Sequence, residues 1–275
     1  MQQTGFEIEP FFLTGEQGAL FCIHLYPTDI TPKGNILYLH PFAEEMHKSR
    51  RMAALQARRF AAEGYAVLQV DLTGCGDSAC DFGDATWAAW LSDARRAHAW
   101  LTTKTTGPVI LWGLRTGASL AVELASTLPG IQHLVLWQPV INGEQFLTQF
   151  LRIKLASEML SGSQTQSGTK ALRTKLETGE SIEVGGYMLG AAMAHDLARL
   201  KLGTPPPPCP VTWLEVGAEE SDHPTPASQR IVDAWRTAGV TVHTRTVTGE
   251  PFWVTQEITE CPGFIEATSR LAFNL

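Results

Sequence analysis

Cysteine is scarce in this sequence and irregularly spaced. The 275 residues include five cysteines, an odd number, and no two of them form a C-x-x-C pair. Neither a disulfide framework nor a zinc site is built from such a pattern. We therefore expect reduced thiols, no bound metal and a cytoplasmic location.

The sequence also lacks an excess of positive charge and long apolar runs. It has 21 Lys and Arg against 28 Asp and Glu, a net charge of −7, so nucleic acid is not an expected partner. No apolar stretch approaches the length of a membrane span, and the first residues lack the basic and apolar regions of a secretory signal. It contains no P-loop or dinucleotide-binding motif. We expect a protein that does not span a membrane and uses no cofactor.

What the sequence does contain is a regular alternation of apolar strands and amphipathic helices. Runs at 6–13 and 19–27, joined by a polar linker with glycine, predict an antiparallel hairpin. Further strands are expected at 36–40, 65–72, 109–114, 133–140, 211–217 and 240–247. Helices are expected at 49–64, 86–101, 116–128 and 226–238. A final helix is expected between the strand at 240–247 and the C-terminus. The nearly continuous apolar strands predict a mostly parallel sheet flanked by helices.

The alternation stops between residues 141 and 203. An amphipathic helix is expected at 146–160, a polar loop at 161–169, and two more short helices after it. The proline run at 204–210 cannot join a helix or a central strand, so it is a stiff spacer. These patterns predict a helical lid or cap at 141–203 inserted into a core made of 1–140 and 204–275.

Three motifs follow predicted strands in a characteristic order. They are "HPFAEE" at 40–45, "DLTGCGDS" at 71–78 and "GLRTG" at 113–117. Together they resemble the oxyanion loop, the D-x-x-G-x-G-x-S loop and the G-x-S-x-G elbow of the α/β-hydrolase superfamily. The resemblance covers most of the chain and implies an α/β-hydrolase fold.

A narrower resemblance is to the exosortase A system-associated hydrolase type 2 family. It is carried by "GCGDSACDF", "LWGLRTGASLA", "WQPVINGEQFLTQFLR", "EVGGYML" and "PFWVTQEI". This resemblance implies a link to exopolysaccharide production and protein sorting in Gram-negative bacteria, with that machinery as a partner. Because a fold does not establish a function, the chemistry has to be argued from the site.

The residues expected for catalysis by a serine, a histidine and an acid are incomplete. Arg115 stands at the nucleophile position of the elbow, and a guanidinium cannot act as a nucleophile. The loop "TGEPFWVTQE" after the last strand contains no histidine, where the superfamily places its base. Of the acidic residues after the strand at 211–217, Glu220 has the best spacing for the acid. The sequence therefore predicts a triad that lacks its serine and its histidine.

Arg115 itself suggests a binding site for an anion. Free N–H groups and a partial positive charge at a helix start favour a carboxylate or phosphate, which arginine can hold through two hydrogen bonds. We expect Arg115, Thr116, Phe42 and Glu44 to bind such a ligand, with the N–H groups of Phe42 and Thr116 as donors. An equally weighted alternative is an internal ion pair of Arg115 with Glu44, Glu45 or Glu220.

Two functions follow from these residues. The first is binding of an anionic acyl, peptidyl or lipid-phosphate ligand without hydrolysis. The alternative is an ester or thioester hydrolase with a displaced nucleophile, Cys75, and His40 as its base. The simpler interpretations are that Cys75 fills a tight turn and that His40 closes its loop through a hydrogen bond.

Overall fold

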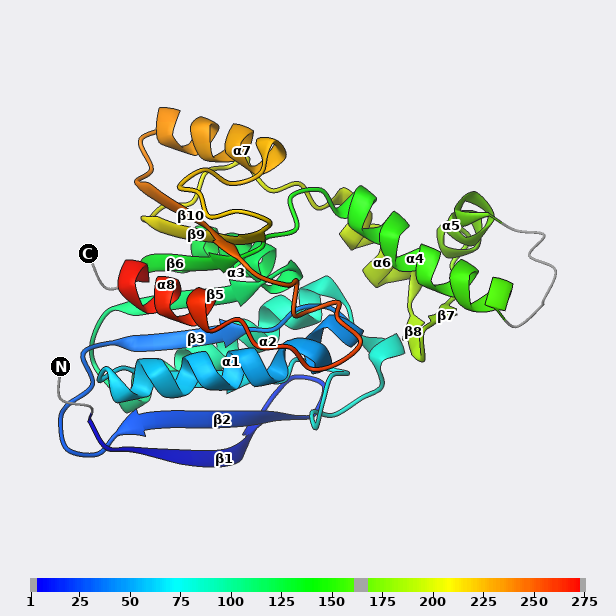
Figure 1. Cartoon of the computed structure of the whole chain (residues 1–275). Coiled ribbons are helices and arrows are strands. Elements are labelled where there is room, and N and C mark those ends of the chain that lie inside the picture. Colours follow the sequence, from blue (N-terminus) through cyan, green and yellow to red (C-terminus); the bar gives the residue numbers. More distant parts are fainter. Residues whose placement is uncertain (1–3, 161–167, 273–275) are drawn as a thin grey trace.

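In the residues that the structure describes, 4–160 and 168–272, eight strands form one central sheet (Figure 1). The structure is a computed structural model. The strands lie in the order β1-β2-β4-β3-β5-β6-β9-β10. Their bounds are β1 Phe6–Thr14, β2 Ala19–Pro27, β3 Asn35–Leu39, β4 Ala66–Val70, β5 Val109–Leu114, β6 Ile131–Trp137, β9 Val211–Gly217 and β10 Val242–Thr248.

The direction of the strands agrees with the apolar patterns of the sequence. β1 and β2 form the predicted antiparallel hairpin, and β2 is also antiparallel to β4. The other neighbouring pairs in the sheet are parallel. β3 and β5 are buried at every position, because helices cover both of their faces. The mostly parallel sheet flanked by helices is therefore confirmed.

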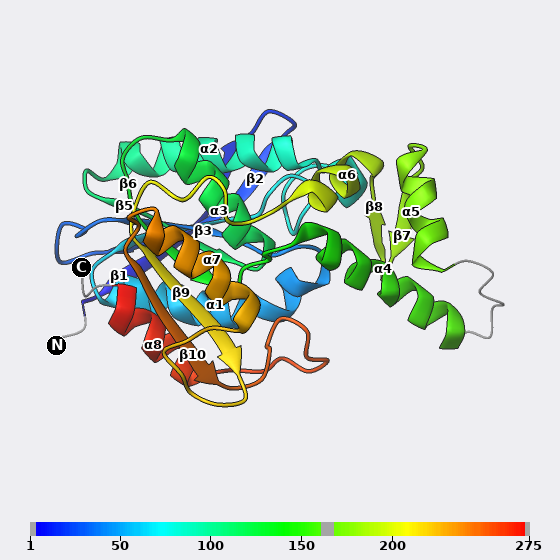
Figure 2. The ribbon, with the colours of Figure 1, turned by 90° about the horizontal axis from the view of Figure 1, so that it is seen from above.

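The helices form two layers, one on each face of the sheet (Figure 2). α1 (Glu44–Ala62) and α8 (Pro262–Ala272) cover one face, where Phe60 and Phe264 join one buried apolar cluster. The other face is covered by α2 (Trp87–Lys104), α3 (Thr116–Thr127) and α7 (Pro226–Thr237), whose apolar side chains join a second cluster. A short 3₁₀ helix, η1 (Phe82–Asp84), precedes α2.

α1 begins five residues earlier than the sequence predicted. The helix was expected at 49–64, but it starts at Glu44, directly after Ala43, which has φ 48°. Glu44 and Glu45 thus lie in the first turn, where carboxylates interact favourably with the partial positive charge of the helix N-terminus. Only residues 40–43 of the "HPFAEE" motif therefore form a loop, and Glu44 and Glu45 belong to α1.

The segment between β6 and β9 forms a separate group of elements, here called the insertion. It contains α4 (Gly143–Leu160), α5 (Thr169–Glu177), β7 (Ile182–Val184), β8 (Tyr187–Leu189) and α6 (Ala191–Arg199). Figure 1 shows these elements together beside the core. The three expected helices are present, whereas most of the expected loop at 161–169 lies outside the described residues.

The hairpin of β7 and β8 was not predicted. Its turn consists of Gly185 and Gly186, with φ of 58° and 87°. A two-residue glycine turn of this kind is a strong hairpin signal, although here it joins strands of only three residues. The insertion contacts the core through aromatic rings, including Tyr187 on Phe82 and Phe150 on Phe42.

A buried histidine in the sheet predicts how stability depends on pH. His24 of β2 is 5% exposed, stacks on Tyr26 and makes an edge contact with the ring of Trp100. Burial, with a smaller effect of Lys104, lowers the pKa of His24 to about 4. The unfolded chain therefore binds a proton that the folded chain excludes as the pH falls from about 6.5 towards 4, and stability falls with it.

Replacing this ring by phenylalanine tests that expectation. His24→Phe keeps the ring contacts but cannot titrate. Relative to the variant, the unmodified protein should lose about 2 kcal/mol of unfolding free energy between pH 7 and pH 5. Urea unfolding at both pH values measures the difference. Equal pH dependence of the two proteins would contradict the assignment.

Candidate functional site

The turn between β5 and α3 is a strained elbow with Arg115 at its tip. Arg115 has φ 57° and ψ −117°, a conformation that side-chain-bearing residues rarely adopt. Its N–H donates to the carbonyl of Trp137 at 2.9 Å, and its own carbonyl accepts from Ala118 at 3.1 Å. Gly113 and Gly117 permit this turn, because a Cβ on either would collide with backbone atoms. The glycines of "GLRTG" thus have the steric role expected of an elbow.

Arg115 forms an ion pair with Glu45 of α1. Its Nε lies 3.1 Å from Glu45 Oε1, and the two side chains are 16% and 6% exposed. The guanidinium carbon lies 5.8 Å from the ring centre of Phe146 and 5.5 Å from that of Trp253. Of the three expected partners, Glu45 is the one that the structure places there. Both rings lie at distances that allow cation–π interactions with the guanidinium.

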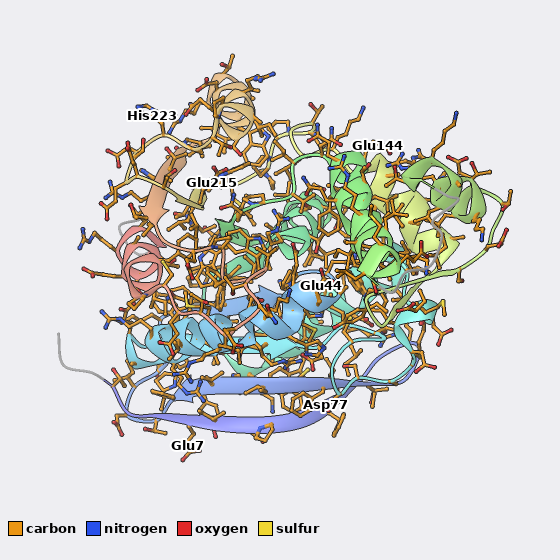
Figure 3. The ribbon with its side chains drawn as sticks, turned by 45° about the vertical axis from the view of Figure 1, so that its right-hand side comes forward. Glu7, Glu44, Asp77, Glu144, Glu215 and His223 are labelled. Atoms are coloured by element: carbon orange, nitrogen blue, oxygen red, sulfur yellow. The ribbon has the colours of Figure 1, made fainter. Side chains whose placement is uncertain are left out.

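Arg115 lines a cavity of about 550 Å³ between the core and the insertion, here called the elbow pocket. This volume is typical of sites for small molecules. One part of its wall is charged and one part is apolar. The lining residues are Phe42, Glu44, Glu45, Lys48, Arg115, Phe146, Gln149, Phe150, Ile153, Gly185 and Val254. Figure 3 shows Glu44 at the start of α1, where the core meets the insertion.

The charged part of the elbow pocket is formed by the beginnings of two helices. α1 contributes Glu44, Glu45 and Lys48, and Arg115 directly precedes α3. Burial raises the pKa of Glu45, although Arg115 opposes this effect, and burial also raises the pKa of Glu44. Lys48 Nζ donates to the carbonyl of Val254 at 3.3 Å and holds the loop after β10. The two carboxylates balance the two cations in this part of the wall, so the features that favour an anion there are the free N–H groups of the two helix N-termini.

The four residues expected to bind the ligand are only partly brought together. Arg115, Phe42 and Glu44 line the elbow pocket. The side chain of Thr116 is fully buried instead and is not part of the pocket wall, and its hydroxyl has no hydrogen-bond partner within the described residues. Its backbone N–H lies at the start of α3, where helix N–H groups lack intrahelical acceptors. Thr116 can therefore act through its backbone alone.

The structure does not support Cys75 and His40 as a displaced catalytic pair. His40 accepts from the N–H of Leu72 through Nε2 at 3.1 Å, and its Nδ1 lies 2.7 Å from the carbonyl of Pro41. Both ring nitrogens are thus engaged, and burial lowers the pKa of His40. Cys75 is 6% exposed, and burial raises the pKa of its thiol, which disfavours a thiolate. His40 thus bridges its own loop and the N–H of Leu72, and Cys75 is buried in a turn.

Glu220 is also placed away from the elbow pocket. It is exposed and forms an ion pair with Arg245 of β10, which also binds Asp222 at 2.9 Å. Arg245 thus neutralises the acidic residues after β9, and no histidine pairs with Glu220 in the described part of the chain. Figure 3 shows His223, on the same loop, well apart from Glu44. The expected acid therefore has a surface role.

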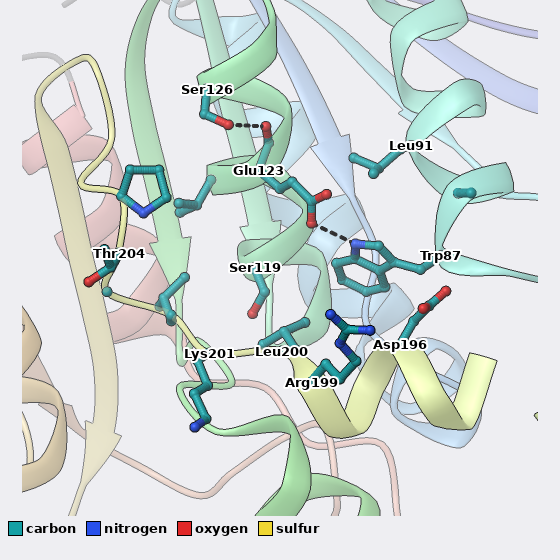
Figure 4. A pocket seen from close by; sticks show the side chains of 15 residues that line it. Trp87, Leu91, Ser119, Glu123, Ser126, Asp196, Arg199, Leu200, Lys201 and Thr204 are labelled. Atoms are coloured by element: carbon teal, nitrogen blue, oxygen red, sulfur yellow. Dashed lines mark hydrogen bonds between the residues drawn. The ribbon is translucent and has the colours of Figure 1, made fainter. Parts of the chain in front are cut away.

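A second cavity of about 580 Å³ lies between α2, α3 and the end of α6 (Figure 4). Some of its polar side chains are hydrogen-bonded within the protein. Glu123 accepts from Trp87 Nε1 at 2.7 Å, and Ser119 donates to the carbonyl of Val140 at 2.9 Å. The cavity shares no lining residue with the elbow pocket, so we do not assign the site to it.

Several residues of the elbow pocket were not identified from the sequence. Lys48 lies one turn after Glu44 on α1, and Phe146 and Phe150 lie one turn apart on α4. The four-residue spacing of these phenylalanines was a usable signal, because it puts both rings on one face of the helix. Assigning that face to the Arg115 pocket required the position of the insertion.

The described part of the chain contains neither a metal cluster nor a membrane-spanning helix. Within residues 4–160 and 168–272, no group of three or more His, Cys, Asp or Glu side chains is arranged to hold a metal ion. None of the helices described there is both long and apolar enough to cross a membrane.

The order of the strands in the sheet and the glycine elbow before α3 are those of an α/β-hydrolase fold. The chain belongs to the family described as serine aminopeptidase, S33, whose model matches residues 30–180. A search of curated proteins finds no match.

Solved structures with the same fold include proteins from several bacteria. Est1E from Butyrivibrio proteoclasticus, solved with ferulic acid bound, is 14% identical, with 95% of this chain and 97% of that chain covered and a TM-score of 0.65. The proline iminopeptidase-related protein from Thermus thermophilus is 18% identical, with 97% and 98% covered and a TM-score of 0.61. A serine hydrolase without lid from Xanthomonas campestris is 16% identical, with 96% and 94% covered and a TM-score of 0.55. At these identities the likeness concerns the fold.

Proposed function

We propose that this protein binds a small anionic ligand with an apolar part in the elbow pocket, and that it does not hydrolyse by a Ser-His-Asp mechanism. The observation that carries the proposal is the orientation of Arg115. Its Nε is held by Glu45, whereas its two terminal amino groups have no hydrogen-bond partner among the described residues. Arg115 lines the pocket, so these groups are available to a carboxylate or phosphate in a two-point contact.

The rest of the pocket supports an amphiphilic ligand. The rings of Phe42, Phe146 and Phe150, with Ile153 and Val254, form an apolar wall next to the charged end. An acyl chain, an apolar peptide end or a lipid tail buried there would gain about 25 cal/mol per Å² of apolar surface. Est1E, which has the same fold, binds ferulic acid, an aromatic carboxylic acid. This supports the use of the fold for such ligands.

The proposal includes the loss of the catalytic triad. Arg115 replaces the serine at the elbow, and the loop after β10 has no histidine that could act as the base. We further propose that residues 141–203 act as a lid on a core made of 1–140 and 204–275. The contacts of Phe146 and Phe150 with Phe42 support this role.

The biological setting is proposed from the sequence resemblance. The motifs shared with the exosortase A system-associated hydrolase type 2 family favour a cytoplasmic accessory protein of exopolysaccharide or exosortase machinery. The ligand would then be an acyl, peptidyl-carboxylate or lipid-phosphate group of that system.

Calorimetric titration with three probes of equal chain length tests the proposed function. Octanoate and octyl phosphate carry the anion, and octanamide does not. We expect octanoate or octyl phosphate to bind the unmodified protein and octanamide to bind much more weakly. Arg115→Ala should lower the affinity for the anion about 10- to 100-fold, because a charge-assisted hydrogen bond contributes about 1.5–3 kcal/mol.

Arg270→Ala is the matched control. Arg270 is an exposed arginine of α8 that pairs with Glu266, so its removal should leave the affinity for the anion unchanged. Full affinity of Arg115→Ala for both anionic probes would refute the proposed function. The tighter of the two anions identifies carboxylate or phosphate as the preferred group.

A further inference from the structure

One carboxylate oxygen of Glu45, in the wall of the elbow pocket, is buried without a hydrogen-bond partner among the described residues. Glu45 is 5% exposed and lines the pocket, and its Oε2 has no hydrogen-bond partner in the described part of the chain. Leaving such an atom unsatisfied costs about 1–3 kcal/mol, more for a charged group. An unpartnered buried carboxylate oxygen in a pocket wall is therefore a sign that a donor arrives with the ligand.

Three hydrogen bonds hold the rest of Glu45 in place. The N–H of Glu45 donates to the carbonyl of Phe42 at 3.1 Å, and its carbonyl accepts from the hydroxyl of Ser49 at 2.7 Å. Its Oε1 accepts from Arg115 Nε. With backbone and one carboxylate oxygen held, rotation of the side chain towards another donor would break the ion pair. Oε2 is thus a preorganised acceptor.

The donors nearest in the sequence are already used elsewhere. The hydroxyl of Ser49 points to backbone carbonyls of α1, and Lys48 Nζ donates to the carbonyl of Val254. Burial raises the pKa of Glu45 and Arg115 opposes this effect. As the carboxylate of the ion pair, Glu45 accepts hydrogen bonds and does not donate them. The terminal amino groups of Arg115 are the remaining donors beside this carboxylate. In the proposed function they hold the anion, so the donor for Oε2 then comes from the ligand.

We infer that the elbow pocket selects an anion that carries a hydrogen-bond donor, a hydroxyl or an amide N–H, next to its charged group. The terminal amino groups of Arg115 would hold the anion while Glu45 Oε2 accepts from the donor. This inference rests on the proposed function and narrows its ligand to hydroxy acids or N-acyl amino acids with an apolar chain. Oε2 belongs to the same carboxylate whose Oε1 accepts from Arg115 Nε, so the two recognition elements are adjacent.

Matched pairs of probes test this selection on the unmodified protein. 2-Hydroxyoctanoate donates a hydrogen bond, whereas 2-methoxyoctanoate has the same oxygen without the proton. N-Hexanoylglycine and its N-methyl derivative form the same comparison for an amide. We expect the donor-bearing member to bind about tenfold more tightly in at least one pair. A preference in one pair alone assigns the donor to that class.

Glu45→Gln sharpens the test. A glutamine that accepts from Arg115 through its oxygen would present an NH₂ group where Oε2 stood, so the preference for the donor-bearing member should be lost or reversed. Glu266→Gln, an exposed glutamate of α8, should keep the preference. Because the probe pairs are compared on the unmodified protein, the inference is decided even where Glu45→Gln does not fold.

The outcomes separate this inference from the proposed function. Equal binding within both pairs, with binding of octanoate still dependent on Arg115, would overturn the selection for a donor and leave the proposed function intact. No binding of any of the acids would overturn both.

Discussion

Gly117→Ala is expected to destabilise the folded protein strongly. A Cβ on Gly117 would lie 2.5 Å from the carbonyl oxygen of His40, and closer still to that of Leu39. Both oxygens belong to the backbone at the end of β3, which is hydrogen-bonded between β4 and β5 and cannot move aside. We expect a loss of about 4 kcal/mol or more in unfolding free energy, a large part of the roughly 5–15 kcal/mol that stabilises an ordinary domain.

The size of this effect follows from the elbow. Gly113 and Gly117 allow α3 to begin directly against the end of β3, and this contact puts Arg115 at the tip of the turn. The same strained conformation would present a serine in a catalytic member of the fold. In this chain the residue at the tip of that turn is Arg115.

Urea unfolding of Gly117→Ala and of a control measures the effect. Gly263→Ala is the control, because Gly263 is an exposed glycine of α8 whose Cβ would make an ordinary contact of 3.4 Å with Val247. Alanine should leave the stability there unchanged or raise it by up to about 1 kcal/mol. Wild-type stability of Gly117→Ala would contradict the close approach of α3 and β3.

Arg115→Ala is expected to destabilise the protein by about 3 kcal/mol at neutral pH. The substitution leaves the carboxylate of Glu45 buried without its counter-charge. Removing one partner of a buried pair costs about 3–5 kcal/mol, and the partial exposure of Arg115 places the expectation at the lower end. The double variant Arg115→Ala/Glu45→Gln removes the unpaired charge and should be clearly more stable than the single variant.

The pH dependence distinguishes this cause from lost packing. Burial raises the pKa of Glu45 and Arg115 opposes the rise, so removing Arg115 raises that pKa further. A carboxyl whose pKa is raised on folding is stabilising below its unfolded value, near 4.5, and this contribution is lost as the pH rises through the folded value. The deficit of Arg115→Ala should therefore shrink as the pH falls from 7.5 to 5, measured by urea unfolding. An unchanged deficit would point to packing of the Arg115 side chain instead.

The fold could be predicted from the sequence because its signals are local. The continuous apolar runs of β3 and β5 predicted a buried parallel sheet. The two glycines of "GLRTG" predicted the elbow, because its steric requirements lie within five consecutive residues. The exact start of α1 could not be predicted, because Ala43 adopts a positive φ that the sequence does not reveal.

The site was harder to predict because it depends on contacts between distant segments. Glu44, Glu45 and Glu220 were equally suitable partners for Arg115, and only the helical register of α1 selects Glu45. Glu220 was expected as the catalytic acid from its spacing, but Arg245 of the neighbouring strand pairs with it at the surface. Such choices between chemically equivalent residues are made by tertiary structure.

The central claim is that the elbow presents a guanidinium that contacts a bound anion. The most direct measurement is the NMR spectrum of arginine side-chain N–H groups in ¹⁵N-labelled protein during titration with octanoate and octyl phosphate. The signals of Arg115 are identified by their absence from the spectrum of Arg115→Lys. We predict that they shift progressively and reach saturation with one of the two anions. Unchanged Arg115 signals at concentrations that saturate binding would contradict the claim.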